Sequence, residues 1–414
     1  MKHNALLGAS LLAFTVCPWV HASELADSPF FKDSKTTLLN RNFFFNRDFR
    51  DNASTAQSYR QEWAQGLIGT FTSGYTAGTV GFGVDAIGMY GFKLDSSSDR
   101  INSGLLPSSG NAVAGVDHAE NDYSKATGAI KIKVSKTVLK YGGLQVATPV
   151  FATADSRLLP ETVEGFFLSS KEIPDLTIEA GHFTSMTLQA YSGRADSRLT
   201  EADMLGVTYK FTPQLTGYLY GSSVEDYWKK RYAALAWVRP IDSLQSVQLD
   251  ARFYDLKSQG AERSGELDNQ SFSLKGAYTY GGHTFALARQ EVHGKGAFQL
   301  YVDGTNTDYL SNYIQYAEFV REHEKSWQVR YDYNFAMVGV PGLNFMTRYV
   351  HGDNFSAQAG QNDREWERDV DMSYVLQSGT AKGLSFRVRQ ATYRNSFNGS
   401  LDEVRLITEY PISL

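Results

Sequence analysis

The chain has 414 residues, of which 42% are apolar and 13% aromatic, and it contains one cysteine. This composition excludes a disordered chain and a disulfide scaffold, and apolar runs of about 20 residues do not recur as they would in a helical membrane protein. Lys and Arg number 40 against 45 Asp and Glu, a formal net charge of −5, which argues against generic nucleic-acid binding. A soluble all-β protein and a membrane β-barrel both remain open.

The N-terminus has the pattern of a secretory signal peptide. Lys2 precedes an apolar stretch over residues 5–14, and Val20-His21-Ala22 offers a cleavage site. A transmembrane anchor would need about 20 apolar residues, more than this stretch supplies. We therefore expect residues 1–22 to be removed on export and residues 23–414 to form a single domain.

Segments of alternating polarity, separated by turn residues, follow along the rest of the chain. In residues 326–335, apolar and aromatic side chains from Trp327 to Phe335 share one face, and polar side chains share the other. Residues 247–254 and 272–280 repeat the pattern. A soluble sandwich would turn the polar face to external water, whereas a membrane barrel turns the apolar face to lipid and the polar face to a wet lumen. Alternation alone does not distinguish them.

The connections between these segments alternate between short and long. Tight links are predicted at 73–74, 136, 173–174, 212–213, 240–241, 281–282, 340–342 and 380–382. Longer polar connections are predicted at about 48–60, 95–122, 148–162, 185–202, 224–230, 257–269, 293–325, 353–368 and 395–401. Because a sandwich has no reason to place every long connection at one end, we predict an all-β fold, a transmembrane antiparallel β-barrel of 18 strands in a bacterial outer membrane.

A barrel of this size is too wide for its side chains to fill, so loops must narrow the passage. Segment 148–162 is apolar and bounded by prolines. Loops are tolerated at membrane depth where they line a cavity, so we predict that it folds inward with Asp155 and Arg157 on the rim of a constriction. Packing on the outer rim is the alternative. The second candidate constriction element is segment 293–325, with Asp303, Asp308 and Ser311.

Cationic residues recur on the polar faces of the C-terminal segments. In residues 384–390, Phe386 and Val388 point to lipid, which sends Arg387 and Arg389 into the lumen. A guanidinium at the lipid midplane would cost about 2–4 kcal/mol, which also favours the inward orientation. The same parity predicts further inward cations at Arg405, Arg348, Arg330, Lys275, Arg252, Lys131 and Lys133.

A row of lumenal cations suits anionic solutes, because fixed positive charges lower the potential along a narrow path and hold carboxylates by forked hydrogen bonds. The alternative is that these cations brace a wide barrel by pairing with carboxylates of the same lumen. The candidate partners are Asp250, Asp332, Asp371 and Glu409. The pattern leaves both interpretations open, although lumenal charges commonly serve selectivity.

Six motifs in order resemble the OprD family of substrate-specific outer-membrane channels: residues 41–48, 62–66, 78–85, 156–160, 340–343 and 384–389. The resemblance implies a third loop folded inward, a basic row with acidic residues opposite, and uptake of small carboxylate-bearing nutrients, either amino acids or aromatic acids. It places Arg41, Arg157, Arg387, Arg389 and Arg405 in the basic set. Segment 293–325 departs from the family pattern in length and composition, and within it Asp308, near Ser311, is preferred to Asp303 as the acidic partner.

Catalytic motifs are not recognisable around the histidines of the mature chain. His182 and His283 are interpreted as polar lumen or loop residues, and His323, between two glutamates, as part of a solvated charge run. Cys17 precedes the predicted cleavage site, so the mature chain has no thiol. We therefore expect neither catalysis nor a cofactor nor a metal.

The main functional prediction is a channel for passive, substrate-selective diffusion. Its expected partners are small carboxylate-bearing solutes and outer-membrane lipid, without nucleic acid, and its expected state is a monomer or a loose trimer. The alternatives are a general, non-specific porin and, less favoured, an outer-membrane barrel hydrolase.

Overall fold

The structure, a computed structural model, describes residues 28–50, 57–111, 116–195, 199–304, 306, 309–357, 360–397 and 399–414. The predicted signal peptide, residues 1–22, lies outside these residues, and its removal stays a prediction. Among the residues described, no helix is long and apolar enough to cross a bilayer.

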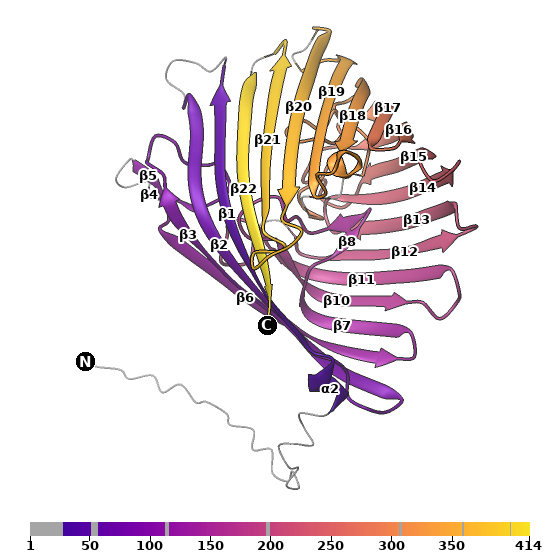
Figure 1. The fold of residues 1–414 in the computed structure, drawn as a ribbon. Helices are drawn as coiled ribbons and strands as arrows, with labels where there is room; N and C mark the ends of the chain where they lie inside the picture. The colour runs from indigo at the N-terminus through magenta and orange to yellow at the C-terminus, as the bar shows by residue number, and fades with distance from the viewer. Residues whose placement is uncertain are drawn as a thin grey trace.

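Eighteen antiparallel strands of the described chain form one closed barrel, as predicted (Figure 1). The strands of its wall are β1 (Lys35–Phe49), β2 (Tyr59–Thr72), β3 (Val80–Asp95), β6 (Asp122–Val134), β7 (Thr137–Leu144), β10 (Thr162–Ser170), β11 (Leu176–Thr187), β12 (Ala202–Lys210), β13 (Leu215–Val224), β14 (Trp228–Pro240), β15 (Gln245–Ser258), β16 (Asp268–Tyr280), β17 (His283–Lys295), β18 (Lys325–Asn334), β19 (Leu343–Phe355), β20 (Asp363–Val375), β21 (Ser385–Asn395) and β22 (Leu401–Ser413). Each pairs with the next in this order, and β22 pairs with β1 from Thr37↔Ser413 to Phe49↔Leu401. Closure leaves no open edge, which hydrocarbon would not tolerate.

Six short elements lie outside the barrel wall in the described chain. Two hairpins lie in the connections, β4 (Ser108–Asn111) with β5 (Val116–Ala119) and β8 (Ala147–Thr148) with β9 (Phe151–Ala152). The helix α2 (Pro29–Lys32) precedes β1, and a 3-10 turn, η1 (Phe335–Val338), follows β18. None of these elements belongs to the barrel wall.

All eight predicted tight links join successive strands at one end of the barrel, here called the turn rim. The nine remaining connections lie at the opposite end, here called the loop rim. The connection predicted at 224–230 is shorter than expected and spans only residues 225–227. Its strands extend further because Trp228 and Lys230 face the lumen, where both are fully buried.

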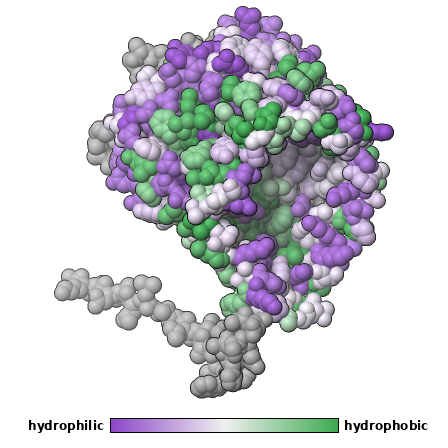
Figure 2. All heavy atoms as spheres, viewed as in Figure 1, coloured by the Kyte–Doolittle hydropathy of each residue, from purple (hydrophilic) through white to green (hydrophobic). Residues whose placement is uncertain are grey.

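The wall carries its apolar side chains outward and its polar side chains inward. Leu205, Leu219 and Leu287 are more than 60% exposed on the outer face, whereas Glu367 and Glu403 are fully buried on the inner face. Phe386 and Val388 are also exposed, as the parity argument predicts. Figure 2 shows hydrophilic residues gathered along the upper rim and a hollow in the face toward the viewer. This is the inside-out polarity of a barrel that meets lipid on its outer surface.

Several connections from the loop rim contribute side chains to the lumenal clusters, among them the connection between β7 and β10, here called the first inward loop, and the connection between β17 and β18, the second. Leu158 and Leu159, from the connection between β7 and β10, are fully buried in one cluster with Phe43 and Phe45 of β1. A Cβ at Gly66 on β2 would lie only 3.2 Å from the Leu158 carbonyl oxygen, so wall and loop touch directly. The predicted inward folding of segment 148–162 is therefore confirmed.

The polarity of the wall can be tested with matched arginine substitutions on the outer face of β16. Leu274→Arg should lower the free energy of unfolding in lipid vesicles by about 2–4 kcal/mol, because it places a guanidinium in the apolar band. Gln270→Arg, on the same face but nearer the loop rim, should cost only about 0–1 kcal/mol. Urea titration of both variants measures the difference, and equal losses would contradict the outward assignment.

Candidate functional site

The constriction is organised around the guanidinium of Arg41, an inward residue of β1 that is 5% exposed. Its Nη1 donates to Asp155 Oδ1 at 2.6 Å and to the carbonyl oxygens of Arg157 and Leu158 at 2.9 and 3.2 Å. Its Nε donates to Glu409 Oε1 of β22 at 2.6 Å. One side chain thus ties the inward loop to the two strands that close the barrel.

A cluster of guanidinium groups surrounds Phe45, next to this clamp. We call Phe45, Arg47, Arg157, Arg405 and Glu403 the Phe45 cluster. The guanidinium carbons of Arg47 and Arg405 lie 5.3 Å from the Phe45 ring centroid, and that of Arg157 lies 5.4 Å from it. Such positions over an aromatic ring are attractive for a cation.

The Phe45 cluster contains more positive than negative charge. Arg47 and Arg405 share Glu403, each with an N–O distance of 2.6 Å. Arg157 donates to the carbonyl and hydroxyl of Ser156, and no carboxylate in the described part of the chain lies within 4.0 Å of it. Burial lowers the pKa of the Arg157 guanidinium, and the charge of Arg405 lowers it further. The cluster is therefore suited to attract an anion.

Two further cations share one carboxylate nearer the turn rim. Arg387 Nη2 lies 2.6 Å from Asp371 Oδ2, and Arg389 Nε lies 3.1 Å from the same oxygen. The Arg387 side chain is 47% exposed and the Arg389 side chain 19% exposed. Because one carboxylate balances two guanidinium groups, this part of the wall also carries surplus positive charge.

Two of the remaining predicted cations are each balanced by one carboxylate. Arg348 pairs with Asp369 and Arg330 with Asp332, each at 2.7 Å. Lys275 lies 3.5 Å from Asp250, which Arg252 also approaches, at 3.8 Å. The one-to-one pairs of Arg348 and Arg330 match the bracing interpretation, whereas Lys275 and Arg252 share the Asp250 carboxylate and Lys131 shares that of Asp85 with Lys140. The predicted cations therefore divide into balanced pairs and cations that share a carboxylate.

Two adjoining cavities bring most of the predicted residues together. The first, of about 370 Å³, is lined by Arg41, Asp155, Arg157, Arg387, Arg389 and Glu409 among others. The second, of about 250 Å³, shares Arg387 and Ser373 with the first and extends past Arg330 and Asp332 toward the turn rim. Together they outline a path on the turn-rim side of the constriction, along the wall with surplus cations.

A third cavity, of about 380 Å³, lies on the loop-rim side. It is lined by residues of the connection 296–324 together with Glu365 and Tyr393. Glu318 in its wall accepts a hydrogen bond of 2.5 Å from the Tyr301 hydroxyl, and burial raises the pKa of Glu318. The lumen therefore has an approach containing carboxylates and tyrosines before the Phe45 cluster.

The residues singled out in segment 293–325 serve as anchors in the structure. The fully buried Asp303 carboxylate lies 2.6 Å from the fully buried Lys230 ammonium and accepts from Trp228 Nε1 at 3.1 Å. Ser311 contacts Ser273 Oγ of β16 through its amide and its hydroxyl, each at 3.1 Å. Asp308 lies outside the described residues. A substrate role for Asp308 and Ser311 stays a prediction.

The inner face of β20 carries a column of carboxylates, of which sequence reasoning identified only Asp371. The column consists of Asp363, Glu365, Glu367, Asp369 and Asp371, all 6% exposed or less. Glu367 accepts from the amides of Tyr316 and Ala317 at 2.9 and 2.6 Å and so holds the second inward loop. The acidic residues at every second position of 363–371 could have predicted this column. The inward orientation of Phe45 and Arg47 could not be predicted in the same way, because three consecutive phenylalanines obscure the alternation in β1.

A closed barrel with a lipid-facing outer surface and a polar lumen narrowed by inward loops defines an outer-membrane channel of the porin class. A comparison with known protein families identifies the family within this class. The family model described as outer membrane porin, OprD family, matches residues 28–414, and the chain belongs to this family. It is therefore a protein of the bacterial outer membrane, as predicted.

Relatives in two pseudomonads support the same assignment. Porin D of Pseudomonas aeruginosa PAO1 is 38% identical, covering 100% of this chain and 99% of that protein, and the porin-like protein GalP of Pseudomonas putida KT2440 is 33% identical, covering 93% of each. The crystal structure of P. aeruginosa OccK9 (OpdG) superposes with a TM-score of 0.88 at 37% identity, covering 93% of this chain and 100% of that one. P. aeruginosa OpdK with vanillate gives 0.85 at 36%, with the same coverage.

Arg41 should control how far the inward loop narrows the channel. Removing one partner of a buried ion pair costs about 3–5 kcal/mol, so Arg41→Ala should release segment 148–162 and increase single-channel conductance in KCl. Arg263→Ala removes an exposed guanidinium that lies 3.1 Å from Asp226 at the loop rim, and its conductance should match the wild type. Unchanged conductance in Arg41→Ala would show that Arg41 does not hold the loop.

Proposed function

We propose that the protein is a channel for passive, selective diffusion of small carboxylate-bearing nutrients, either amino acids or aromatic acids. The carrying observation is the first lumenal cavity, where Arg387 and Arg389 share one carboxylate and Arg157 has none within 4.0 Å in the described chain. A solute carboxylate can replace the missing counter-charge. Forked guanidinium donors suit its geometry.

The arrangement also supports passage in addition to binding. A carboxylate drawn to the Phe45 cluster has Arg387 and Arg389 next along the adjoining cavities, followed by Arg330. Each of these guanidinium groups already interacts with a protein carboxylate or carbonyl, so a solute competes with existing partners and can leave again. Several weak sites in series are what conduction requires.

The residues proposed to contact solute are those of the basic row and its rim. They are Arg41, Arg157, Lys275, Arg330, Arg348, Arg387, Arg389, Arg405, Asp155, Asp308 and Ser311. Six of them, Arg41, Asp155, Arg157, Arg387, Arg389 and Arg330, line the two adjoining cavities, whereas Arg348 is balanced by Asp369 and Lys275 shares Asp250 with Arg252. The solved relative OpdK was crystallised with vanillate, an aromatic carboxylate, which supports this substrate class for a chain 36% identical to it.

Two alternatives make different predictions. A general porin would pass neutral and anionic solutes of equal size at similar rates, and the surplus lumenal charge argues against this. A barrel hydrolase would turn over ester or peptide substrates, whereas the family to which the chain belongs consists of porins. We therefore propose that the protein has no catalytic activity, and that it acts as a monomer or a loose trimer.

Substitution of the cation pair tests the proposal. Arg387→Gln combined with Arg389→Gln should slow uptake of radiolabelled benzoate into proteoliposomes about tenfold, the effect of losing about 1.4 kcal/mol of interaction with the anion. Conductance in KCl should change much less, because Asp371 and the loops still shape the path. Uptake of a neutral sugar of similar size should also be unchanged.

The matched control is Arg231→Gln, which removes an outward guanidinium paired with Asp255 at 3.2 Å. It should leave both measurements as in the wild type. If benzoate uptake and bulk conductance fall together in the double variant, the two arginines serve to brace the barrel and the selectivity proposal is wrong.

A further inference from the structure

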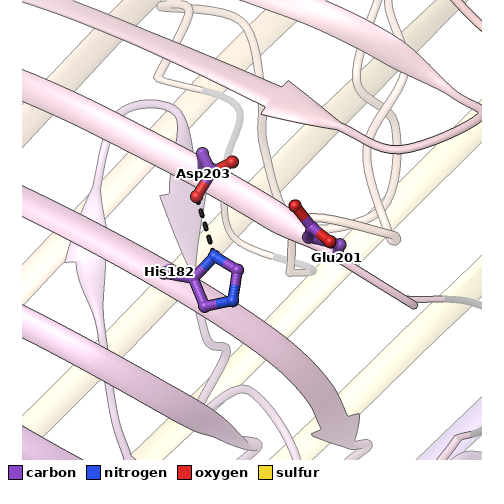
Figure 3. A group of neighbouring side chains, drawn as sticks. All are labelled: His182, Glu201 and Asp203. Carbon is purple, nitrogen blue, oxygen red and sulfur yellow. Dashed lines mark hydrogen bonds and ion pairs between the residues drawn. The ribbon is translucent and has the colours of Figure 1, made fainter.

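Three side chains with metal-binding groups meet on the outer wall, away from the lumen (Figure 3). Ala202 of β12 is fully buried toward the lumen, so the period of two turns Glu201 and Asp203 outward together. His182 of β11 stands directly opposite Asp203 in the strand register. Its neighbour Phe183 is fully buried, which turns His182 outward as well. The interpretation of His182 as a polar lumen or loop residue was therefore wrong.

The geometry of the three groups is that of an incomplete coordination shell. His182 Nδ1 lies 2.8 Å from Asp203 Oδ1, and one ligand atom from each residue lies within 4.8 Å of the others. Ligands about 2.0–2.2 Å from a tetrahedral Zn²⁺ lie roughly 3.4 Å apart, which small rotations of these exposed side chains can reach. An imidazole nitrogen with two carboxylate oxygens is a donor set that suits Zn²⁺ and leaves one position for water.

The carboxylates of Glu201 and Asp203 lack the basic partners that outward carboxylates on nearby strands have. On the outer faces of β14 to β17, Asp255, Asp268 and Glu291 each lie within 3.4 Å of an arginine or lysine nitrogen. In the described chain, by contrast, Glu201 has no basic side chain within 4.0 Å, and Asp203 has only His182. Two adjacent carboxylates without a fixed cation favour a bound dication.

The position of these three residues on the outer wall also favours a bound cation. The next outward residue of β12 toward the turn rim is Leu205, which is 61% exposed, and Phe166 of β10 stands opposite His182 with its ring outward and 45% exposed. The carboxylates therefore lie at the edge of the lipid-facing band that is nearer the loop rim. Uncompensated negative charge is costly at the border of hydrocarbon, and a bound dication would neutralise it.

We propose that His182, Glu201 and Asp203 bind a divalent metal ion of the zinc class at the loop-rim edge of the lipid-facing band. The ion joins β11 and β12 at the base of the connection 188–201, of which Leu188 and Leu199 are buried in the lumenal core. Metal binding therefore stabilises the junction of β11 and β12 next to these two buried leucines. The site is independent of the proposed transport function, and neither proposal depends on the other.

The test uses the whole barrel in detergent, prepared without a histidine tag and washed with EDTA, and titrated with ZnCl₂ by calorimetry. We expect one Zn²⁺ per chain. His182→Ala and Asp203→Asn should each weaken binding at least about tenfold, the loss of one ligand. The matched control is His293→Ala, because His293 Nε2 also lies 3.1 Å from a carboxylate, that of Glu291, but Arg289 already compensates that carboxylate.

Thermal unfolding gives a second readout, because a ligand of the folded state raises the melting temperature. Zn²⁺ should raise it in the wild type and in His293→Ala but not in His182→Ala, and each variant can first be checked for a folded barrel by its heat-modifiable mobility on gels. Three results would overturn the proposal: no Zn²⁺ binding by the wild type, equal binding by His182→Ala, or equal loss in His293→Ala. Binding of CaCl₂ in place of ZnCl₂ would also overturn it, since carboxylates alone would then account for the site.

Discussion

The structure depends on a requirement of the backbone in hydrocarbon: every strand must have a hydrogen-bonded neighbour on both sides. Pairing of β22 with β1 along thirteen register positions satisfies it for the first and last strands, from Thr37↔Ser413 to Phe49↔Leu401. Closure with eighteen strands produces a bore that side chains cannot fill, so the connections must narrow it. The inward loops therefore follow from strand number, and the chemistry of the passage is decided by how these loops are held.

The loops are held by charged groups at their contacts with the wall, and the same charges define the passage. Arg41 clamps the first inward loop through Asp155 and through main-chain carbonyls, while the β20 column holds the second through Glu367. Where a carboxylate has one cation, as in Arg348 with Asp369, the pair braces the wall. Where two cations share one carboxylate, as Arg387 and Arg389 share Asp371, the wall carries surplus positive charge. Balanced pairs and surplus positive charge thus occur at different residues of one network.

The sequence predicts the parts of this architecture that depend on local pattern. The period of two assigns Leu274 outward and Arg389 inward, and glycine, proline and turn residues locate all eight links of the turn rim. Contacts between segments that are far apart in the chain cannot be predicted from such local patterns. The pairing of Asp303 with Lys230 and the three guanidinium groups around Phe45 join residues far apart in the chain, which no periodicity reports. Strand ends also depend on tertiary contacts: Trp228 continues β14 because Asp303 accepts its indole N–H.

The Phe45 cluster brings three guanidinium groups to one aromatic ring beside the first inward loop. Three guanidinium groups with a single carboxylate repel one another, and each lies about as far from the ring centroid as the others. The negative face of the ring attracts cations at this distance and offsets part of that repulsion. An aliphatic residue at this position would separate the charges without attracting them, whereas a carboxylate would neutralise them and remove the attraction for a solute anion. Phe45 therefore allows three cations to lie close together without adding a second negative charge to the cluster.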